Sequence, residues 1–299
     1  TDLVGTEDEL RHLVRPRLGS DLETDLVLPI EVAVYEEHCV MVGEGEETFL
    51  ELLKYYWEAA DRFQNLSDIK GIVLEEGFTG ERELTNIDKL PFIYNNNTDF
   101  TDKFKNRIIY YESQRGCPFR CSYCLSSIDK SVRLRDLETV KKELKFFLDN
   151  KVDQVKFIDR TFNYDKERAM EIWRYLIEND NGVTNFHFEI TADIIDQEAI
   201  DFLKTVRKGL FQFEIGVQST NPHTIHAINR NVNFDKLAGI VKQIKAGGNI
   251  HQHLDLICDY GIIVLECLRS VQVYCHFLIW TVFLINERRQ KGCVHLLTL

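Results

Sequence analysis

Proline is scarce in this sequence, and glycine is not abundant. The 299 residues include 5 prolines and 16 glycines, and 44% of them are hydrophobic. These proportions exclude collagen-like, low-complexity and wholly disordered chains, and they are typical of a folded globular protein. The length corresponds to about two domains, or to one barrel of about 200–250 residues with an appendage.

The sequence also lacks an excess of basic charge, a membrane-length apolar run and several common ligand motifs. Its net charge of −12 repels phosphate backbones, so we expect no nucleic-acid partner. The only membrane-like run, 271–285, contains Gln272 and His276 and is shorter than the roughly 20 residues of a spanning helix, which argues against a membrane anchor. The sequence has no G-x4-G-K-[ST] phosphate loop, G-x-G-x-x-G fingerprint or H-E-x-x-H metal helix.

Cysteine is too sparse for a disulfide scaffold, but its distribution is uneven. Of the 8 cysteines, Cys117, Cys121 and Cys124 form one tight group, and four more fall between residues 258 and 299. This number and spacing differ from those of a small secreted module, so we expect a reduced, cytoplasmic compartment.

Strand-like and helix-like stretches alternate from residue 107 onward. Strands are predicted over 108–113, 152–159, 185–191, 211–219 and 250–257, and an amphipathic helix precedes each of the last four. This alternation predicts parallel βα units and an α/β fold. The earlier part of the chain predicts a valine-rich strand region (26–42), a helix (49–63), a small hairpin (71–80) and a polar linker (81–106).

The predicted strands alternate apolar and polar residues more than buried parallel strands usually do. In 211–218, for example, Phe, Phe, Ile and Val alternate with Gln, Glu, Gly and Gln. A barrel filled by side chains does not tolerate a row of unpartnered polar groups. We therefore expect a polar cavity that holds a ligand, and the alternative is an ordinary sheet with one solvated face.

The clearest chemical signal is the run Gly116-Cys117-Pro118-Phe119-Arg120-Cys121-Ser122-Tyr123-Cys124. It follows the first predicted strand directly, and parallel α/β proteins place their sites at the C-terminal ends of strands. A structural zinc ion takes four protein ligands, and no second Cys or His pair lies at the required spacing. An iron–sulfur cluster held by three thiolates keeps one iron open for chemistry. Zinc and uncommitted reduced cysteines are the alternatives.

The spacing C-x3-C-x2-C, with Tyr123 before the third cysteine, resembles the signature of the radical S-adenosylmethionine (radical SAM) enzymes. Residues 111–118 resemble the subgroup that carries an N-terminal cobalamin-binding domain. Further resemblances lie at 42–49, at 157–163, where Arg160 stands in place of a second acid, at 214–219 and at Arg230. The resemblance covers about residues 40–257.

This resemblance implies a partial (βα)6 TIM-like barrel in which Cys117, Cys121 and Cys124 hold a 4Fe–4S cluster. S-adenosylmethionine (SAM) is expected to bind the open iron through its amino and carboxylate groups. Its reductive cleavage would release methionine and a 5′-deoxyadenosyl radical, which takes a hydrogen atom from a substrate. The implied partners are a small-molecule or peptide substrate and an external one-electron reductant of the flavodoxin or ferredoxin kind.

The resemblance also suggests five side chains near the cofactor. Asp159 is expected to accept the ammonium group of SAM, unless it is a helix cap or a turn residue. Glu189 is expected to bond the ribose hydroxyls or to pair with Arg230. Gln218 matches a position near the cofactor, and Tyr123 belongs to the cysteine motif itself. Arg230 suits the cofactor carboxylate, and the alternative is a surface cation.

Other polar residues are weaker candidates. His251, His253 and Asp255 share one face of the last predicted strand and are candidates for the substrate side, although a lone histidine is more often structural. Arg115 and Arg120 flank the cysteine motif, where they either tune an anionic cluster electrostatically or are simply solvated.

The sequence departs from the cobalamin-dependent subgroup at both ends. About 40 residues precede Gly43, too few for a full cobalamin domain, so we interpret the N-terminal part as a truncated α/β remnant that does not bind cobalamin by itself. The resemblance ends near residue 257, and residues 258–299 form a cysteine-rich apolar tail with 3 acidic and 4 basic side chains. Either the tail is a divergent genuine element, or a truncation or frame error has left the last barrel unit incomplete.

The predicted organisation therefore has four parts: a remnant (1–80), a linker (81–106), a radical SAM core (107–257) and a tail (258–299). The alternatives to an active enzyme are an iron–sulfur electron carrier or structural metal protein, and an inactive truncated copy of a cobalamin-dependent enzyme.

Overall fold

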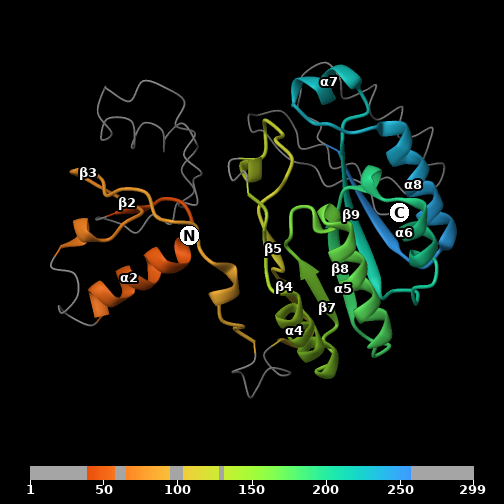
Figure 1. Ribbon diagram of the computed structural model, residues 1–299, viewed down its shortest axis with the longest axis horizontal. Helices are drawn as coiled ribbons and strands as arrows, with labels where there is room; N and C mark the ends of the chain where they lie inside the picture. Colours follow the sequence, from red (N-terminus) through yellow and green to blue (C-terminus); the bar gives the residue numbers. More distant parts are fainter. Residues whose placement is uncertain (1–38, 58–64, 95–103, 128–130, 257–299) are drawn as a thin grey trace. The chain divides into compact units, whose positions relative to one another are not determined.

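The structure, a computed structural model, describes residues 39–57, 65–94, 104–127 and 131–256 (Figure 1). The chain divides into two compact units, Thr1–Asn86 and Ile87–Leu299. The predictions for residues 1–38 and for the tail, including the question of a sixth βα unit, lie outside the described residues. Among the helices in the described ranges, none combines the length and the apolar character needed to cross a membrane.

The first unit pairs a helix with a small antiparallel sheet. Its strands are β1 (Val40–Met41), β2 (Ile72–Leu74) and β3 (Gly77–Phe78), in that order. Helix α2 (Gly45–Trp57) places Leu52 in a small core with Ile69, Ile72 and Leu74. The predicted hairpin is confirmed as the β2–β3 pair. The helix begins four residues before its predicted start because Glu46 and Glu47 suit the positive end of the helix dipole.

The second unit is built on a parallel sheet of five strands. Their order across the sheet is β10-β9-β8-β7-β4, so strands that follow one another in this part of the chain are neighbours. The strands are β4 (Ile108–Tyr111), β7 (Gln154–Phe157), β8 (Asn185–Ile190), β9 (Phe211–Gln218) and β10 (His251–Leu256). Each lies within its predicted range, so the α/β class and the parallel βα units are confirmed.

The helices that connect these strands start at polar caps. They are α4 (Leu137–Asp149), α5 (Lys166–Glu178), α6 (Gln197–Leu203), α7 (Pro222–Ala227) and α8 (Phe234–Gly247). The carboxylate of Asp136 accepts a hydrogen bond from the backbone N–H of Thr139 at 2.8 Å and so caps α4. Asp165, Asp196 and Asn233 cap α5, α6 and α8 in the same way.

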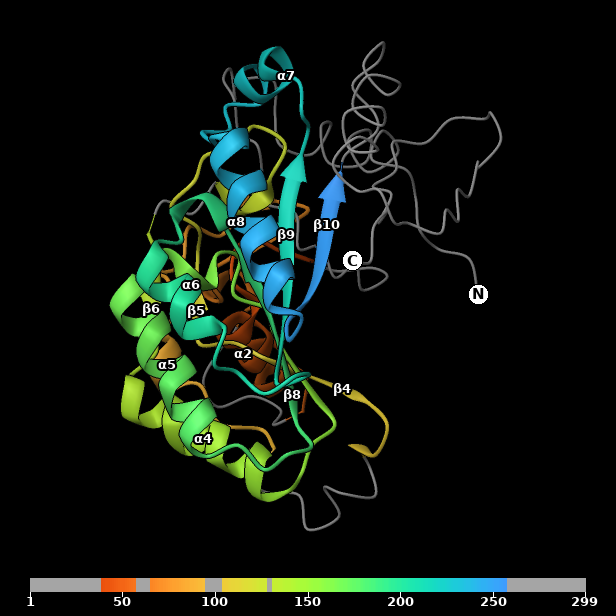
Figure 2. The ribbon, with the colours of Figure 1, turned by 90° about the vertical axis from the view of Figure 1, so that its right-hand side faces the viewer.

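Helices α4, α5, α6 and α8 cover one face of the sheet (Figure 2). The core between the two layers is rich in aromatic rings. The ring of Phe188 lies 4.4 Å from that of Phe162 and 4.6 Å from that of Phe157, and Trp173 of α5 packs against the same group. Burying each such ring contributes about 1.5–3 kcal/mol, so this layer supplies much of the stability of the unit.

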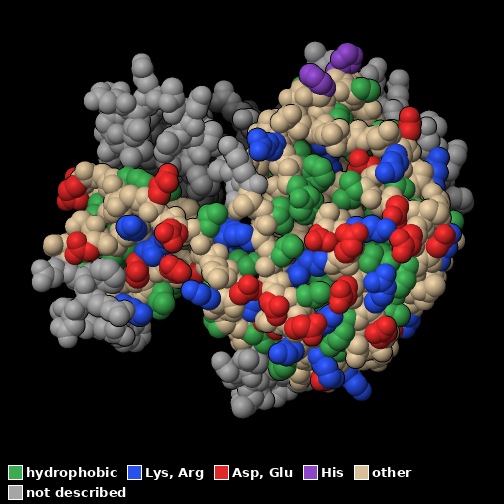
Figure 3. All heavy atoms as spheres, viewed as in Figure 1, with side chains coloured by type: hydrophobic (Ala, Val, Ile, Leu, Met, Phe, Trp, Pro, Cys, Tyr) green, Lys and Arg blue, Asp and Glu red, His purple; other side chains and the backbone are tan. Residues whose placement is uncertain are grey.

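The outer surface of the helical layer carries charges of both signs, interspersed over the face seen in Figure 3. Lys141 of α4 contacts Glu171 of α5 at 2.7 Å, and Lys166 of α5 contacts Glu198 of α6 at 2.8 Å. Exposed pairs of this kind each contribute less than about 1 kcal/mol. They link neighbouring helices without creating a face of one sign.

The opposite face of the sheet is polar, and we call it the polar face. Strand pairing aligns Lys156, His187, Gln212 and His251 in one row across β7 to β10. The next row toward the C-terminal ends holds Glu189, Glu214 and His253. The predicted alternation is confirmed in β9, where the apolar residues are buried and the polar ones are half-buried. The ligand cavity on this face stays a prediction.

Residues 87–94, which the sequence assigns to a linker, belong to the second unit and pack against its core. Ile87 is buried, and the guanidinium of Arg135 donates hydrogen bonds to the carbonyls of Ile87 and Leu90. The ring of Tyr94 lies 5.4 Å from that of Phe147 in α4. The longer stretch 81–106 is polar on average, but residues 87–94 are mostly apolar, and Phe92 and Tyr94 pack against the core of this unit.

Candidate functional site

The cysteine loop, residues 116–124, begins just beyond strand β4. A two-stranded antiparallel hairpin, β5 (Gln114–Arg115) with β6 (Arg133–Leu134), frames it. Gly116 has a φ of +97°, and a Cβ at this position would collide with the carbonyl oxygen of Ser131. Glycine is required here because other residues avoid this backbone conformation and cannot approach so closely.

Asp159, just after β7, forms hydrogen bonds with the two residues of the chain that lead into this loop, Ser113 and Gln114. Its Oδ1 accepts hydrogen bonds from the backbone N–H groups of Ser113 (2.8 Å) and Gln114 (3.1 Å), and its Oδ2 accepts one from the Ser113 hydroxyl (2.5 Å). The side chain is fully buried, and burial raises its pKa to about 7 although the hydrogen bonds from Ser113 act in the opposite direction. These contacts are those of a turn-anchoring residue; contact with the SAM ammonium group stays a prediction.

Thr161 extends this support to the first cysteine. Its backbone carbonyl accepts a hydrogen bond from the Gln114 side chain at 2.7 Å, and its hydroxyl lies 3.5 Å from the Sγ of Cys117. The segment that follows β7 therefore contacts the loop both before and at the first predicted ligand.

The three predicted ligands, Cys117, Cys121 and Cys124, form no disulfide. Cys121 is buried, whereas the other two are half-buried, and the N–H of Cys124 bonds the carbonyl of Cys121 at 3.1 Å in a tight turn. Within the described ranges, no three Cys, His, Asp or Glu side chains come close enough together to share a single metal ion. An iron–sulfur cluster sets a different requirement, because each thiolate binds a different iron atom. Three thiols on one loop supply that donor set, so the residues fit a cluster.

Arg230 lies beside the buried cysteine. Its Nη1 is 3.9 Å from the Sγ of Cys121, and its Nη2 donates a hydrogen bond to the carbonyl of Gly216 in β9 at 2.6 Å. A Cβ on Gly216 would contact the side chains of Gln218 and Arg230, so these three residues meet at the end of β9. Burial raises the pKa of the neighbouring Tyr123 phenol, and the positive charge of Arg230 opposes this shift. The structure thus brings Tyr123, Gln218 and Arg230 to the cysteine loop.

Glu189 lies apart from this group, on the polar face. The expected pair with Arg230 is wrong as far as the described contacts go, because Arg230 bonds Gly216 while Glu189 lies 4.0 Å from Arg160. Burial raises the pKa of Glu189, and the nearby charge of Glu214 adds to this shift. Arg160, the residue that departs from the family pattern, is therefore the cation that faces Glu189. The predicted hydrogen bonds from the ribose hydroxyls of SAM to Glu189 stay a prediction.

A charged network lies next to Glu189. Glu214 contacts the Lys156 ammonium at 2.8 Å and the Nε2 of His187 at 3.2 Å. These partners hold the pKa of Glu214 at about 2, well below its ordinary value of 4.5. The predicted residues His251 and His253 adjoin it, with ring centres 4.7 Å apart, and burial lowers the pKa of both. This surface therefore carries neutral imidazoles beside a fixed carboxylate near neutral pH.

The two arginines that flank the cysteines differ from each other. Arg115 forms a two-pronged pair with Glu112 at 2.7 and 2.8 Å, so its charge is compensated locally. Arg120 has an exposed side chain, and its backbone carbonyl accepts a hydrogen bond from Asn229 at 2.8 Å. The solvated interpretation thus describes the Arg120 side chain, while its backbone belongs to the support of the loop.

Several residues of the site are not apparent from the sequence. Ser113, Thr161 and Asn229 act through partners that lie 46, 44 and 109 residues away in the chain. No local pattern indicates such contacts. His187 and Glu214 had one available signal, because strand alternation places them on the same face as Glu189 and His253.

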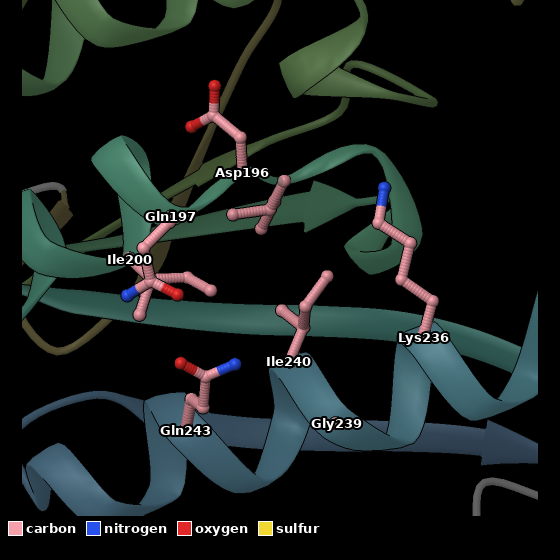
Figure 4. A pocket seen from close by; sticks show the side chains of 8 residues that line it. Asp196, Gln197, Ile200, Lys236, Gly239, Ile240 and Gln243 are labelled. Carbon is pink, nitrogen blue, oxygen red and sulfur yellow. The ribbon is translucent and has the colours of Figure 1, made fainter.

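A hollow of about 360 Å³ lies elsewhere, between α6 and α8 (Figure 4). Its lining combines apolar Ile200 and Ile240 with polar Gln197 and Gln243. It belongs to the helical layer and shares no residue with the cysteine loop or the polar face, so it is not part of the candidate site.

Known proteins share this motif and fold. Residues 111–258 match the model of the Radical SAM superfamily. An uncharacterized methyltransferase of Pyrococcus horikoshii is 26% identical over 220 residues, which cover 70% of this chain and 46% of that protein. The ribosomal protein uS12 methylthiotransferase RimO of Dictyoglomus thermophilum is 23% identical over 275 residues, which cover 81% of this chain and 61% of RimO. The chain thus spans less than two thirds of the length of these curated relatives.

Solved structures confirm the fold. The radical SAM methyltransferase TsrM of Kitasatospora setae, solved with cobalamin and a [4Fe-4S] cluster bound, has a TM-score of 0.58 at 15% identity, over 79% of this chain and 49% of its own. The cobalamin-dependent SAM radical enzyme OxsB has a TM-score of 0.60 at 18% identity, over 78% of this chain and 36% of its own. The partial TIM-like barrel is thereby confirmed. Motif, fold and family match together show that residues 111–258 belong to the radical SAM superfamily of enzymes.

Proposed function

We propose that the second unit binds a 4Fe–4S cluster through Cys117, Cys121 and Cys124 and cleaves SAM. The observation that supports this most is the presence of three free thiols on one loop at the C-terminal end of a parallel sheet, with contacts to that loop from Thr161, which follows β7, and from Asn229 and Arg230, which follow α7. When bound, such a cluster supplies the electron that breaks a carbon–sulfur bond of SAM.

The residues around the loop prepare the thiols for this role. Asp159 and Thr161 fix the backbone and the side chain ahead of the first ligand. The guanidinium of Arg230 lies 3.9 Å from the Sγ of Cys121 and so places a positive charge beside the proposed anionic cluster. Arg230 has further N–H donors, and a carboxylate such as that of SAM is the group that a guanidinium binds best.

The substrate is proposed to lie on the polar face. Strand pairing sets Asp255 opposite Gly216, beside Gln218 and Arg230, and the row of His253 and Glu214 follows one step further from the loop. A small-molecule or peptide substrate with polar groups suits this surface. The electron is proposed to come from an external reductant of the flavodoxin or ferredoxin kind.

Iron analysis tests cluster binding. Anaerobic reconstitution of the full chain is expected to give about four iron and four sulfide ions per chain. The Cys121→Ala variant should lose most of this iron, whereas Cys39→Ala, which removes a half-buried cysteine of the first unit, should not. Iron content that Cys121→Ala leaves unchanged contradicts the proposal. Loss of iron in Cys258→Ala or Cys267→Ala would indicate a fourth protein ligand and favour an electron carrier.

Product analysis tests the reaction. The reduced, reconstituted chain incubated with SAM is expected to form 5′-deoxyadenosine. The relatives named above are a methyltransferase and a methylthiotransferase, so S-adenosylhomocysteine, the product left when SAM donates its methyl group, should be measured in the same samples. A full cluster with neither product would identify an inactive copy.

A further inference from the structure

The segment Ile228-Asn229-Arg230 contacts the cysteine loop at three successive residues. The side-chain amide of Asn229 donates to the carbonyl of Arg120 at 2.8 Å, and the N–H of Ser122 donates to the carbonyl of Ile228 at 2.9 Å. Between these two bonds lies Cys121, whose Sγ is near Arg230. The buried cysteine is therefore held on both sides by a segment that lies more than a hundred residues later in the chain.

This segment has a fixed shape because it ends a capped helix. Asn221 caps α7 by accepting a hydrogen bond from the N–H of His223 at 2.8 Å, and Pro222 occupies the first turn. At the other end, the N–H groups of residues 228, 229 and 230 bond the carbonyls of Thr224, His226 and Ile225 at 3.0 to 3.1 Å. Ile228 is 4% exposed, so its side chain anchors the segment in the protein. The contacts to the cysteine loop thus start from a rigid support.

Asn229 meets two demands at once. Its φ of +51° lies in the left-handed region, which asparagine tolerates better than most residues. Its side chain also supplies the N–H donor that reaches the carbonyl just before Cys121. Glycine would keep the backbone conformation without the donor, and aspartate would keep the side-chain shape but set an oxygen against the carbonyl oxygen of Arg120.

We propose that Asn229 is a positioning residue for Cys121. Asn229 holds the loop backbone so that the Cys121 thiol stays buried and oriented for cluster binding. This rests on the proposed function only in taking Cys121 as a ligand. The positioning itself is a property of the chain before any cluster is loaded, and it can be measured there.

The test is the alkylation rate of each cysteine in the full, metal-free chain, measured by iodoacetamide labelling and peptide mass spectrometry. Cys121 is 5% exposed, so it reacts only when the loop opens locally. We expect Asn229→Asp and Asn229→Gly to raise the labelling rate of Cys121 about tenfold, which corresponds to about 1.4 kcal/mol of opening free energy. Asn106→Gly is the matched control, because Asn106 also has a positive φ, of 58°, and does not belong to the site. Cys39 is the internal reference.

Two results would overturn the proposal. One is a Cys121 rate within twofold of the wild-type rate in both Asn229 variants. The other is an equal rise at Cys39, or in Asn106→Gly, which would reveal general loosening. If Asn229→Asp does not fold, Asn229→Gly decides, because glycine accepts the same backbone conformation. The outcome is independent of cluster chemistry: a wild-type chain that binds no iron would refute the proposed function and leave the labelling result standing.

Discussion

The buried carboxylate of Asp159 leads to a pH-dependent stability that its amide replacement should abolish. Burial raises the pKa of Asp159 from 3.8 to about 7, so the folded protein holds this proton more tightly than the unfolded chain does. Between pH 4 and pH 7, roughly, the free energy of unfolding therefore falls as the pH rises, and above pH 7 the loss is complete. A change of this size corresponds to about 4 kcal/mol.

The Asp159→Asn variant carries no charge at either end of this range. Its amide oxygen still accepts hydrogen bonds from the N–H groups of Ser113 and Gln114, while the bond with the Ser113 hydroxyl is altered, at a cost of about 1 kcal/mol. We expect the variant to lie within about 1 kcal/mol of the wild type at pH 5 and to be about 2–4 kcal/mol more stable at pH 8.5.

Urea unfolding of the metal-free chain, followed by circular dichroism at both pH values, measures this difference. Comparing variant with wild type at each pH cancels the contributions of all other titrating groups. Asp149→Asn, an exposed carboxylate of α4 paired with Lys145, serves as the control and should change stability by less than about 0.5 kcal/mol. A stability difference between Asp159→Asn and the wild type that is the same at pH 5 and pH 8.5 would refute the reasoning.

Three further predictions concern the frame of the site. Gly116→Ala is expected to destabilise the protein by about 2–4 kcal/mol in urea unfolding, because the new methyl group collides with the carbonyl of Ser131, whereas Gly182→Ala, also at positive φ but with open space around it, should cost only about 1 kcal/mol. Phe188→Ala removes the ring at the centre of the aromatic core and should cost about 3–5 kcal/mol, visible as a lower midpoint of thermal unfolding. Glu214→Gln should lower the free energy of unfolding by about 1–2 kcal/mol at pH 7, because His187 and Lys156 lose their charged partner. The pKa of Glu214 is lowered to about 2, so this cost should shrink as the pH falls from 4.5 toward 2. A cost that stays constant over that range would argue against the network.

Much of the fold can be predicted from the sequence because its determinants are local. The period-two pattern of 211–218 predicts both strand β9 and the separation of its two faces, and each Asp or Asn cap marks the start of a helix. The cysteine spacing is equally local, since all three predicted ligands lie on one loop. The position of the loop after the first parallel strand then predicts the end of the sheet at which the site forms.

The support of the site cannot be predicted in this way, because its contacts are long-range. The role of Asp159 depends on backbone N–H groups at residues 113 and 114, which carry no signal in the sequence. The sequence suggests either the ribose hydroxyls or Arg230 as the partner of Glu189, and of the two arginines the fold brings Arg160 to it, because Arg160 follows the neighbouring strand β7. The sequence allows many pairings of acidic with basic side chains, and the register of the strands determines which of these ion pairs form.

The bracing of the cysteine loop has a consequence for the order of assembly. The loop is held by residues 159–161 and again by residues 228–230, so two large chain closures must occur before its thiols take up their final positions. Contacts of such high sequence separation carry a loop-closure entropy cost, which slows their formation. A nascent chain that has emerged only through Cys124 therefore carries all three thiols but no site. For the proposed cluster, this order implies that iron and sulfide are delivered to a chain whose barrel strands up to β9 have already paired, so cofactor delivery would follow folding instead of guiding it.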